Sequence, residues 1–467
     1  TAGRSLHIAR HFQMAVPIRT HVLNAIVTDS FDINFQQAKE DAPMISSALI
    51  RTIVLAAMTS FILVASPVFS GEKVKVFILA GQSNMVGHAR AHTIATLLAS
   101  DKARDKELIR LVFKQSSGHS KATFEKQLAL GRKLDELTGG ISFEKIKALS
   151  PGPKKTAVEA HVKELKETHE AYKQEVTSSC VVSDRVYINS IADRNVRSGK
   201  LAVGYGGDGK KIGPEYAFGL SIAEKIDGPI LIIKTSWGGK SLNYNFRPPS
   251  AGTYELSEKE KSSGKAEEIR KNASLNWRMM NEAVHAVLDN LEDNHPDYNA
   301  DAGYEIAGFV WFQGFNDQFS PSFRDNYKAN MISFIKDVRK EYKVPNMPFV
   351  IGVLGTGVTA EKVAGNAVSV GQREAARTLG FTDKVAAVES YTEYSHFSNE
   401  IFKKGWPKHF HEWDTVGSDR PYHYLGSGAF FVRLGAAFAD SMTGLMEKNE
   451  EIIMGKPFFE GKQLGNE

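Results

Sequence analysis

The chain has 467 residues, of which 42% are hydrophobic and 24% charged, a composition typical of a soluble globular protein with a large core. Its formal net charge of +4 is small for this length, so the charge gives no reason to expect a nucleic-acid partner. The single cysteine, Cys180, excludes an intramolecular disulfide and a cysteine-based zinc site.

The N-terminal part has the pattern of a targeting signal. Residues 1–43 show no clear periodicity and begin with Thr, so we expect translation to start at Met44. A basic residue then precedes an apolar run over residues 52–65, and small and turn-forming residues follow. This pattern predicts a signal peptide over residues 44–70 and a secreted or periplasmic mature chain without stable membrane insertion, starting near Gly71. The alternative is an uncleaved membrane anchor, although the run is short for a membrane span.

The most informative segment is a strand that leads into a tight turn. Val74 to Leu79 form an apolar run of strand length, a Gly81-Gln82-Ser83-Asn84 turn follows, and helix-forming residues come next. The Ser83 hydroxyl is thereby predicted at the carboxyl end of a strand, where ligands bind in open α/β sheets. Ser83 is a candidate nucleophile, and the alternative is that it only caps the helix.

Residues 88–185 are rich in Lys and Glu and have helical periodicity. One amphipathic stripe begins at Phe124 and a second runs from Val158 to Val176, with Pro151-Gly152-Pro153 between them. We predict a helical insertion, either a hairpin or a small bundle, whose lysines face solvent. A lid over the site or an arm that docks a partner is the alternative.

The rest of the chain alternates strand and helix patterns. Apolar runs predict four further strands, over Pro229–Thr235, Ile306–Phe312, Phe349–Leu354 and Lys384–Glu389. Helical periodicity predicts three core-facing helices, over Trp277–Leu291, Tyr327–Val338 and Phe430–Met442. Five strands alternating with helices predict a doubly wound α/β domain with a five-stranded parallel sheet over residues 71–447, followed by a tail at 448–467.

Three further segments follow predicted strands or precede the last helix. Gly238-Gly239 follows the second strand, where glycines let backbone N–H groups approach a ligand, although a plain turn has the same pattern. Asn316 follows the third strand, and its amide could donate to an oxyanion or serve only in a turn. His423 precedes the last helix and could act as a general base oriented by Asp419, although an isolated His is more often structural.

The order of these segments resembles the SGNH hydrolase superfamily, which is named after its Ser, Gly, Asn and His blocks. Within it, the block from Gly81 to Met85 resembles the sialic-acid-specific acetylesterase family, which includes carbohydrate esterase family six. Ile212-Gly213-Pro214-Glu215 and Gln313-Gly314 are also similar to that family. The resemblance covers roughly residues 73–87 and 203–445.

The resemblance implies a three-layer αβα flavodoxin-like fold that needs no metal or other cofactor. It further implies Ser83 as nucleophile, His423 as base, and Asn316 and a glycine of the Gly238-Gly239 pair as oxyanion donors, of which we take Gly239.

Two features depart from the family pattern. The acid of the superfamily usually lies three residues before the His, a position held here by Arg420, whereas Asp419 lies four before it. Asp414 is a second candidate for the acid, and a Ser–His pair without a strong acid partner is a third reading. Phe315 stands where the family commonly has an acidic residue after Gln-Gly.

We therefore predict a secreted serine esterase that removes O-acetyl groups from a carbohydrate substrate, with Gln82, Gln313 and Arg247 as substrate-binding residues. The alternative from another class is a catalytically impaired glycan-binding protein on the same fold. A less favoured reading is a metal site formed by His409, His411, Glu412 and Asp414.

Overall fold

The structure, a computed structural model, describes residues 71–138, 152–193, 195–356 and 359–453. The predicted segments 1–43 and 44–70 lie outside the described residues. Within the described ranges, no helix combines the length and the apolar character that crossing a membrane requires.

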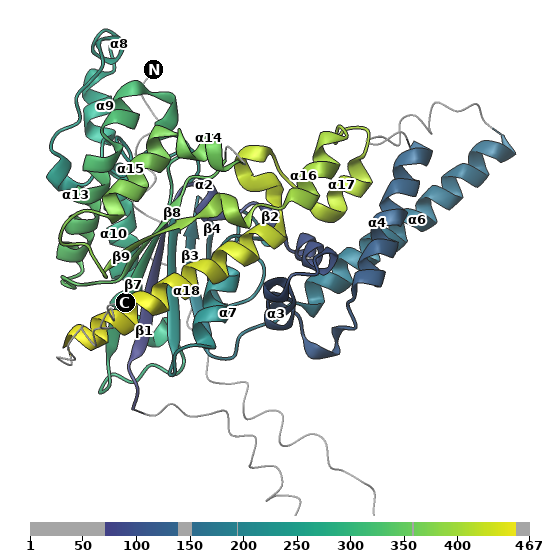
Figure 1. The fold of residues 1–467 in the computed structure, drawn as a ribbon, viewed down its shortest axis with the longest axis horizontal. Coiled ribbons are helices and arrows are strands. Elements are labelled where there is room, and N and C mark those ends of the chain that lie inside the picture. Colours follow the sequence, from purple (N-terminus) through teal and green to yellow (C-terminus); the bar gives the residue numbers. More distant parts are fainter. Residues whose placement is uncertain (1–70, 139–151, 194, 357–358, 454–467) are drawn as a thin grey trace, which may run out of the picture. The chain divides into compact units, whose positions relative to one another are not determined.

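The centre of the molecule is a seven-stranded sheet in the order β4-β3-β6-β1-β7-β8-β9 (Figure 1). All neighbouring strands in it are parallel except β3 and β4, which pair antiparallel at one edge. A separate two-stranded ladder joins β2 and β5. The strands are β1 (Val74–Gly81), β2 (Ala89–Arg90), β3 (Val186–Ala192), β4 (Asn195–Lys200), β5 (Lys211–Ile212), β6 (Ile230–Ser236), β7 (Tyr304–Phe312), β8 (Phe349–Val353) and β9 (Val385–Glu389).

All five predicted strands are present and parallel, but the prediction of a five-stranded sheet is wrong. The additional strands β3 and β4 form an edge hairpin directly after the insertion. Buried and half-buried residues alternate along β3, and half-buried and exposed residues alternate along β4. Neither strand therefore carries the apolar run by which the other five strands were recognised.

Helices cover both faces of the sheet, so the fold has three layers, with the sheet between two layers of helices (Figure 1). The α-helices are α2 (Ser83–Val86), α3 (Ala103–Val112), α4 (Lys121–Thr138), α6 (Pro153–Ser179), α7 (Glu215–Ala223), α8 (Glu258–Lys261), α9 (Ala266–Asn272), α10 (Leu275–Leu288), α11 (Leu291–Asn294), α12 (Pro321–Asp325), α13 (Tyr327–Glu341), α14 (Ala360–Ala364), α15 (Ala367–Ala376), α16 (His396–Lys403), α17 (Phe410–Val416) and α18 (Gly428–Ile453). The 3-10 helices include η1 (Ala91–Ala99), η4 (Asp317–Phe319) and η6 (Pro421–Gly426). The three predicted core helices correspond to α10 with α11, to α13 and to α18, and α18 continues into the predicted tail.

Alternate side chains of β1 enter two separate cores, as the two-residue period of a strand requires. Phe77 and Leu79 pack in the core that contains residues of α7 and α18. Val76 and Ile78 pack in the opposite core with residues of α10, α13 and α15. Because β1 is buried on both faces, its loop end is held rigidly in the middle of the sheet.

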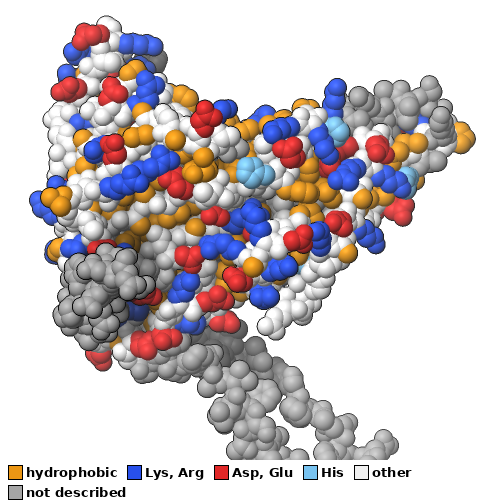
Figure 2. Space-filling model, in the orientation of Figure 1, with side chains coloured by type: hydrophobic (Ala, Val, Ile, Leu, Met, Phe, Trp, Pro, Cys, Tyr) orange, Lys and Arg blue, Asp and Glu red, His pale blue; other side chains and the backbone are white. Residues whose placement is uncertain are grey.

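The predicted insertion is helical and consists of η1, α3, α4 and α6. Helices α4 and α6 pack against each other and extend away from the sheet as an arm (Figure 1). The buried side chains of Leu134 and Val162 form a small core of their own between the two helices. Lys/Arg and Asp/Glu side chains are interspersed over the visible face of the arm, as expected for a solvated surface (Figure 2).

A buried ion pair ties the Ser83 turn to the adjacent strand. Lys234 on β6 and Glu215 at the start of α7 are both fully buried, and their side chains lie 2.8 Å apart. The Lys234 ammonium also donates to the carbonyl of Val86, at the end of α2, and to that of Tyr205. The second Glu215 oxygen accepts the Gly213 N–H, which gives the predicted Gly213-Pro214-Glu215 segment a structural role.

Replacing Lys234 by methionine is expected to lower the free energy of unfolding by about 3–5 kcal/mol, because the Glu215 carboxylate would stay buried without a countercharge. The double variant Lys234→Met/Glu215→Gln should recover part of this loss, because it removes both charges. Denaturant unfolding of the two single variants and the double variant measures the coupling. A Lys234→Met protein as stable as the parent would show that Glu215 does not depend on Lys234.

Candidate active site

Three neighbouring parallel strands bring the predicted segments to one edge of the sheet. Gly81 at the end of β1 pairs with Ser236 on β6 and with Phe312 on β7. Ser83, the Gly238-Gly239 pair and Asn316 come directly after these three strand ends. The carboxyl edge of the sheet at β6-β1-β7 therefore gathers residues that lie far apart in the sequence.

The predicted strand–turn–helix around Ser83 is present. A side chain at Gly81 would place its Cβ 2.1 Å from the Phe312 carbonyl oxygen, so this close turn requires glycine. Helix α2 starts at Ser83, which is 9% exposed. Gln82 at the helix start makes no side-chain cap. The Ser83 hydroxyl has no hydrogen-bond partner among the described residues.

Gln82 connects the serine turn to the loop after β7. Its amide nitrogen donates to the Asn316 side-chain oxygen at 3.0 Å. Its amide oxygen accepts from Gln313 Nε2 at 3.2 Å and from the backbone N–H groups of Gly314 and Asn316 at 3.2 and 3.3 Å. Since the Asn316 oxygen is occupied, its amide N–H groups are the part of that side chain left free to donate.

The residues predicted to bind substrate are engaged inside the protein. Gln82 is 1% exposed and Gln313 is 2% exposed, and both side chains are held by protein groups. The Arg247 guanidinium donates to backbone carbonyls of Asn243, Ala251 and Gly252 and so holds its own loop. These contacts give the three side chains a positioning role, and their contact with substrate stays a prediction.

A buried carboxylate that the sequence analysis overlooked orients the loop after β6. Asp317 is fully buried and accepts the N–H groups of Leu242 and Asn243 at 2.9 and 3.0 Å, together with Gln313 Nε2 at 2.5 Å. Burial raises the pKa of Asp317 to about 6, and these hydrogen bonds oppose the shift. Asp317 lies two residues after Phe315, the position at which the family commonly has an acidic residue. The loop after β7 therefore does contain a carboxylate, and this carboxylate binds the backbone of the loop after β6.

The two glycines after β6 have different hydrogen bonding. The Gly238 N–H donates to Asp193 Oδ1 at 2.7 Å, and a Cβ at Gly238 would lie 3.9 Å from that of Ser83. Gly239 has a φ of +70°, which favours glycine, and its N–H has no acceptor among the described residues. Gly239 is therefore the glycine of the pair whose N–H can donate to a ligand. Asp193 follows β3, one of the strands that the sequence analysis missed.

A tight turn holds the predicted histidine and its acid together. His423 Nδ1 lies 3.1 Å from Asp419 Oδ1, and the Arg420 N–H donates to the same oxygen at 2.7 Å. Tyr424 and Leu425 have φ of 49° and 65°, a left-handed pair that reverses the chain after His423. Between the acid and the histidine, the His423 N–H donates to the Arg420 carbonyl at 2.9 Å, and this turn places the two side chains side by side despite their unusual spacing.

The same turn is bonded to the serine helix. Asn84, the residue after Ser83, donates its side-chain amide to the carbonyl of Tyr422 at 3.2 Å. Tyr422 precedes His423, so this bond joins the neighbours of the candidate nucleophile and base. The two candidate residues therefore lie on segments that touch, as the predicted site requires.

His88 is a second histidine at this acid, and nothing in the sequence pointed to it. Its ring stacks on that of His423 with centroids 4.0 Å apart and planes 3° apart. Its Nδ1 lies 3.4 Å from Asp419 Oδ2, so each histidine faces a different carboxylate oxygen. Burial raises the pKa of Asp419, but the hydrogen bonds from His423 and His88 outweigh it and hold this pKa well below its ordinary value. Burial also lowers the pKa of His88, which favours its neutral form.

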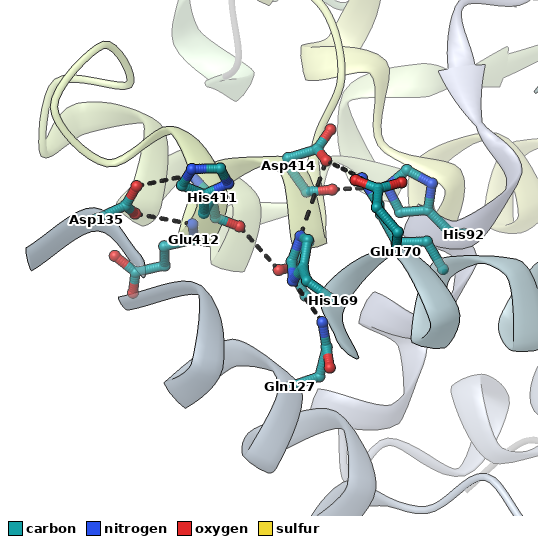
Figure 3. A network of polar contacts seen from close by, with 10 residues as sticks. His92, Gln127, Asp135, His169, Glu170, His411, Glu412 and Asp414 are labelled. Atoms are coloured by element: carbon teal, nitrogen blue, oxygen red, sulfur yellow. Dashed lines mark hydrogen bonds and ion pairs between the residues drawn. The ribbon is translucent and has the colours of Figure 1, made fainter. Parts of the chain in front are cut away.

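Asp414 lies elsewhere and has different partners. Its carboxylate pairs with Lys173 of α6 at 2.6 Å, and its backbone carbonyl lies 2.6 Å from His92 Nε2 (Figure 3). Asp135 of α4 accepts the N–H groups of His411 and Glu412, so this part of α17 fastens the arm (Figure 3). Asp419, and not Asp414, is the carboxylate beside His423.

The alternative metal site on α17 is not assembled. Glu412 pairs with Arg132 at 2.7 Å and with Lys404 at 2.8 Å. Among the described residues, one group of His, Cys, Asp or Glu side chains has potential ligand atoms that all lie within 4.8 Å of one another. It consists of His88, Asp419 and His423. The polar residues of α17 therefore have structural partners, and His409, His411, Glu412 and Asp414 do not form a group of this kind.

Aromatic side chains flank Asn316 and His423 at the surface. Phe315 packs against Phe319 and Tyr422 with ring centroids 5.1 and 5.7 Å apart. Phe319 is 67% exposed and Tyr422 is 44% exposed, and all three line a pocket of about 580 Å³. By contrast, Trp311 is fully buried in the core. Exposed rings beside a polar site form a surface on which a sugar face can stack.

The chain matches a model of a known protein family. The family model for "Carbohydrate esterase, sialic acid-specific acetylesterase" matches residues 170–401. The predicted resemblance is thereby confirmed over this stretch, as is the predicted class of carboxylic ester hydrolase. The match includes Gly239 and Asn316, whereas Ser83 and His423 lie outside it. No curated protein sequence matches the chain.

Solved structures resemble the chain only weakly. A protein from Arabidopsis thaliana has 15% identity and a TM-score of 0.33, over 68% of this chain and 86% of its own. A carbohydrate acetylesterase from Xanthomonas citri has 12% identity and a TM-score of 0.32, over 68% of this chain and 49% of its own. NanS has 11% identity and a TM-score of 0.32, over 69% of this chain and 78% of its own. At these TM-scores the alignments carry no argument about function.

Proposed function

We propose that this chain, which matches the sialic acid-specific acetylesterase family over residues 170–401, is a secreted serine esterase that removes O-acetyl groups from a carbohydrate. The observation that carries the proposal is the meeting of three strand ends with the His423–Asp419 turn around Ser83. The five strands recognised in the sequence lie in the order 2-1-3-4-5, which is that of flavodoxin and supports an SGNH-type fold. Secretion rests on the signal peptide predicted over residues 44–70.

The reaction begins with proton transfer from the nucleophile. Asp419 accepts the Nδ1 proton of His423, which leaves Nε2 as the base. His423 Nε2 takes the proton of the Ser83 hydroxyl while the Ser83 oxygen forms a bond to the acetyl carbonyl carbon. The carbonyl electrons move to its oxygen, which becomes the oxyanion. The Asp419 carboxylate stabilises the imidazolium that forms.

The oxyanion is held by three donors and the intermediate then collapses. The N–H groups of Ser83 and Gly239 and the side-chain amide of Asn316 donate to the negative oxygen. The bond to the sugar oxygen breaks, and His423 returns its proton to that oxygen, which leaves as a hydroxyl. Water attacks the acetyl-enzyme by the same steps and releases acetate and free Ser83.

The direct test is release of acetate from an O-acetylated glycan by the purified chain. Acetate release at a rate above that of buffer is expected. A folded protein that binds the glycan and releases no acetate would favour the rival function, a glycan-binding protein.

Gln82 is expected to act through Asn316, because it fixes the amide of Asn316 with its oxygen turned inward. Asn316→Ala should lower kcat about 10²–10³-fold, the usual effect of removing one oxyanion donor. Gln82→Ala should lower kcat less, with little change in KM, because the amide can then rotate. Steady-state kinetics on an aryl acetate measures both effects.

The double variant tests whether the two residues form one unit. In the Asn316→Ala background, Gln82→Ala should cost little more, since the group that it orients is already gone. Fully multiplicative losses in the double variant would contradict this role of Gln82.

A further inference from the structure

A second cavity adjoins the site on the side of the acid. It has a volume of about 850 Å³, within the range of about 300–1,000 Å³ usual for ligand pockets. Its walls come from α6 of the arm, from α16 and α17 with the segment between them, and from Arg90 and Lys210 beside the β2-β5 ladder. Asp419 lines this cavity and bonds His423, so the cavity reaches the proposed catalytic acid.

Ion pairs fix the wall formed by the arm. Lys173 pairs with both Glu170 and Asp414 at 2.6 Å, so the two acids on this wall share a cation. His92 is held at the Asp414 carbonyl, and Glu170 and Asp414 face each other across this corner (Figure 3). The arm is therefore anchored where it lines the cavity, and Lys173 offsets one of the two negative charges on this wall.

Three other cations in the lining have no such partner. The side chains of Arg90, Lys210 and Arg420 form no ion pair with any described residue, whereas Asp419 is engaged by the two histidines. The Arg420 guanidinium lies 4.9 Å from the ring centroid of Trp406. Arg90 is half-buried, whereas Lys210 and Arg420 are exposed. Guanidinium groups can bind carboxylate and sulfate ligands with two parallel hydrogen bonds.

Aromatic rings line the cavity beside these cations. Phe402, Trp406 and Phe410 are half-buried and line the same cavity as the free cations. Rings of this kind stack on the C–H face of a sugar, while the cations take its acidic substituent. A lining that combines the two fits a charged sugar better than a neutral sugar or an apolar ligand.

We propose that this cavity is a subsite for an anionic sugar residue of the substrate chain, adjacent to the residue whose ester is cleaved. The proposal rests on the esterase function proposed above and names the substrate class, an oligosaccharide that bears carboxylate or sulfate groups. The acetylated residue occupies the Ser83 side of Asp419, and the anionic neighbour occupies the side lined by Arg90, Lys210 and Arg420. The helical insertion thus widens the site from a single sugar to a charged chain.

The experiment measures binding of unacetylated oligosaccharides to the full chain by isothermal titration calorimetry, because these probes cannot be turned over. An oligogalacturonate supplies carboxylates, a sulfated galacto-oligosaccharide supplies sulfates, and a xylo-oligosaccharide of equal length is neutral. At least one anionic probe should bind about tenfold or more tightly than the neutral probe, as expected for charge-assisted hydrogen bonds. The stronger of the two anionic probes identifies the acidic group.

Variants locate the binding. Arg90→Gln and Lys210→Gln should each weaken binding of the preferred anionic probe by about tenfold and leave binding of the neutral probe unchanged. Arg377→Gln and Lys336→Gln are matched controls, since both side chains are exposed, have no ion pair among the described residues and lie outside the cavity lining. These controls should bind as the parent does.

Failure of the subsite and failure of the esterase give different results. Equal affinity for anionic and neutral probes, no binding of any probe, or equal effects of cavity and control variants would overturn the subsite, even if the chain hydrolyses acetyl esters. A chain that binds the anionic probe through Arg90 and Lys210 but releases no acetate would overturn the esterase alone.

Discussion

Replacing Ser83 by alanine is expected to lower kcat/KM for an aryl acetate by about 10⁴–10⁶-fold, as loss of the nucleophile does in serine hydrolases. The reason is that the Ser83 oxygen forms the acyl bond, and no other hydroxyl is placed at the end of β1. The measurement is release of the aryl alcohol by the purified variant, together with acetate release from an acetylated glycan. Unchanged thermal unfolding would show that the loss is chemical.

A second serine at the same edge of the sheet provides the control. Ser236 ends β6 and its buried hydroxyl has no hydrogen-bond partner in the described structure. Ser236→Ala makes the same chemical change beside the site and should alter kcat/KM by no more than a few-fold. Full activity of Ser83→Ala, or equal losses in both variants, would refute Ser83 as the nucleophile.

The sheet could be predicted from sequence where its strands are buried on both faces. Val74–Leu79, which only Lys75 interrupts, and Phe349–Leu354 are apolar runs, because helices cover them on either side. The edge hairpin β3-β4 carries polar residues such as Asn189 and Ser198, and its period-two alternation was the available signal.

The site could be predicted where a residue type directly indicates a role. Ser83 and Asn316 are recognisable because each follows a strand, and parallel strand ends meet at one edge. Gln82 and Gln313 were assigned to substrate because the sequence reveals a polar side chain but not its partner. Asp193 could not be found because its contact with Gly238 depends on how β3 packs against β6.

The acid is the residue for which sequence spacing is least informative. A histidine and an acid four residues apart can face each other or point apart, depending on the turn between them. Here the His423 N–H donates to the Arg420 carbonyl, and the Arg420 N–H holds the Asp419 carboxylate beside the ring. His88 then approaches the other carboxylate oxygen from a distant part of the chain. Only the assembled fold distinguishes Asp419 from Asp414.

Asp419→Asn is expected to lower kcat about 10³–10⁴-fold, because the amide can no longer hold His423 in the tautomer whose Nε2 accepts the Ser83 proton. KM should change little, since Asp419 stabilises the imidazolium and not the bound ester. Asp414→Asn is the matched comparison. It removes one of the two acidic partners of Lys173 on the arm, so it should lower the thermal stability while kcat falls by no more than a few-fold.

Kinetics and thermal unfolding of the two variants, measured side by side, distinguish a loss of catalysis from a loss of stability. A kcat loss confined to Asp414→Asn would mean that the carboxylate beside His423 is not the catalytic acid. Equal activity of both variants with the parent would mean that the Ser83–His423 pair works without a carboxylate. The first pattern contradicts the assignment of the acid alone, whereas the second leaves Asp419 with only the structural task of holding His423 and His88 together.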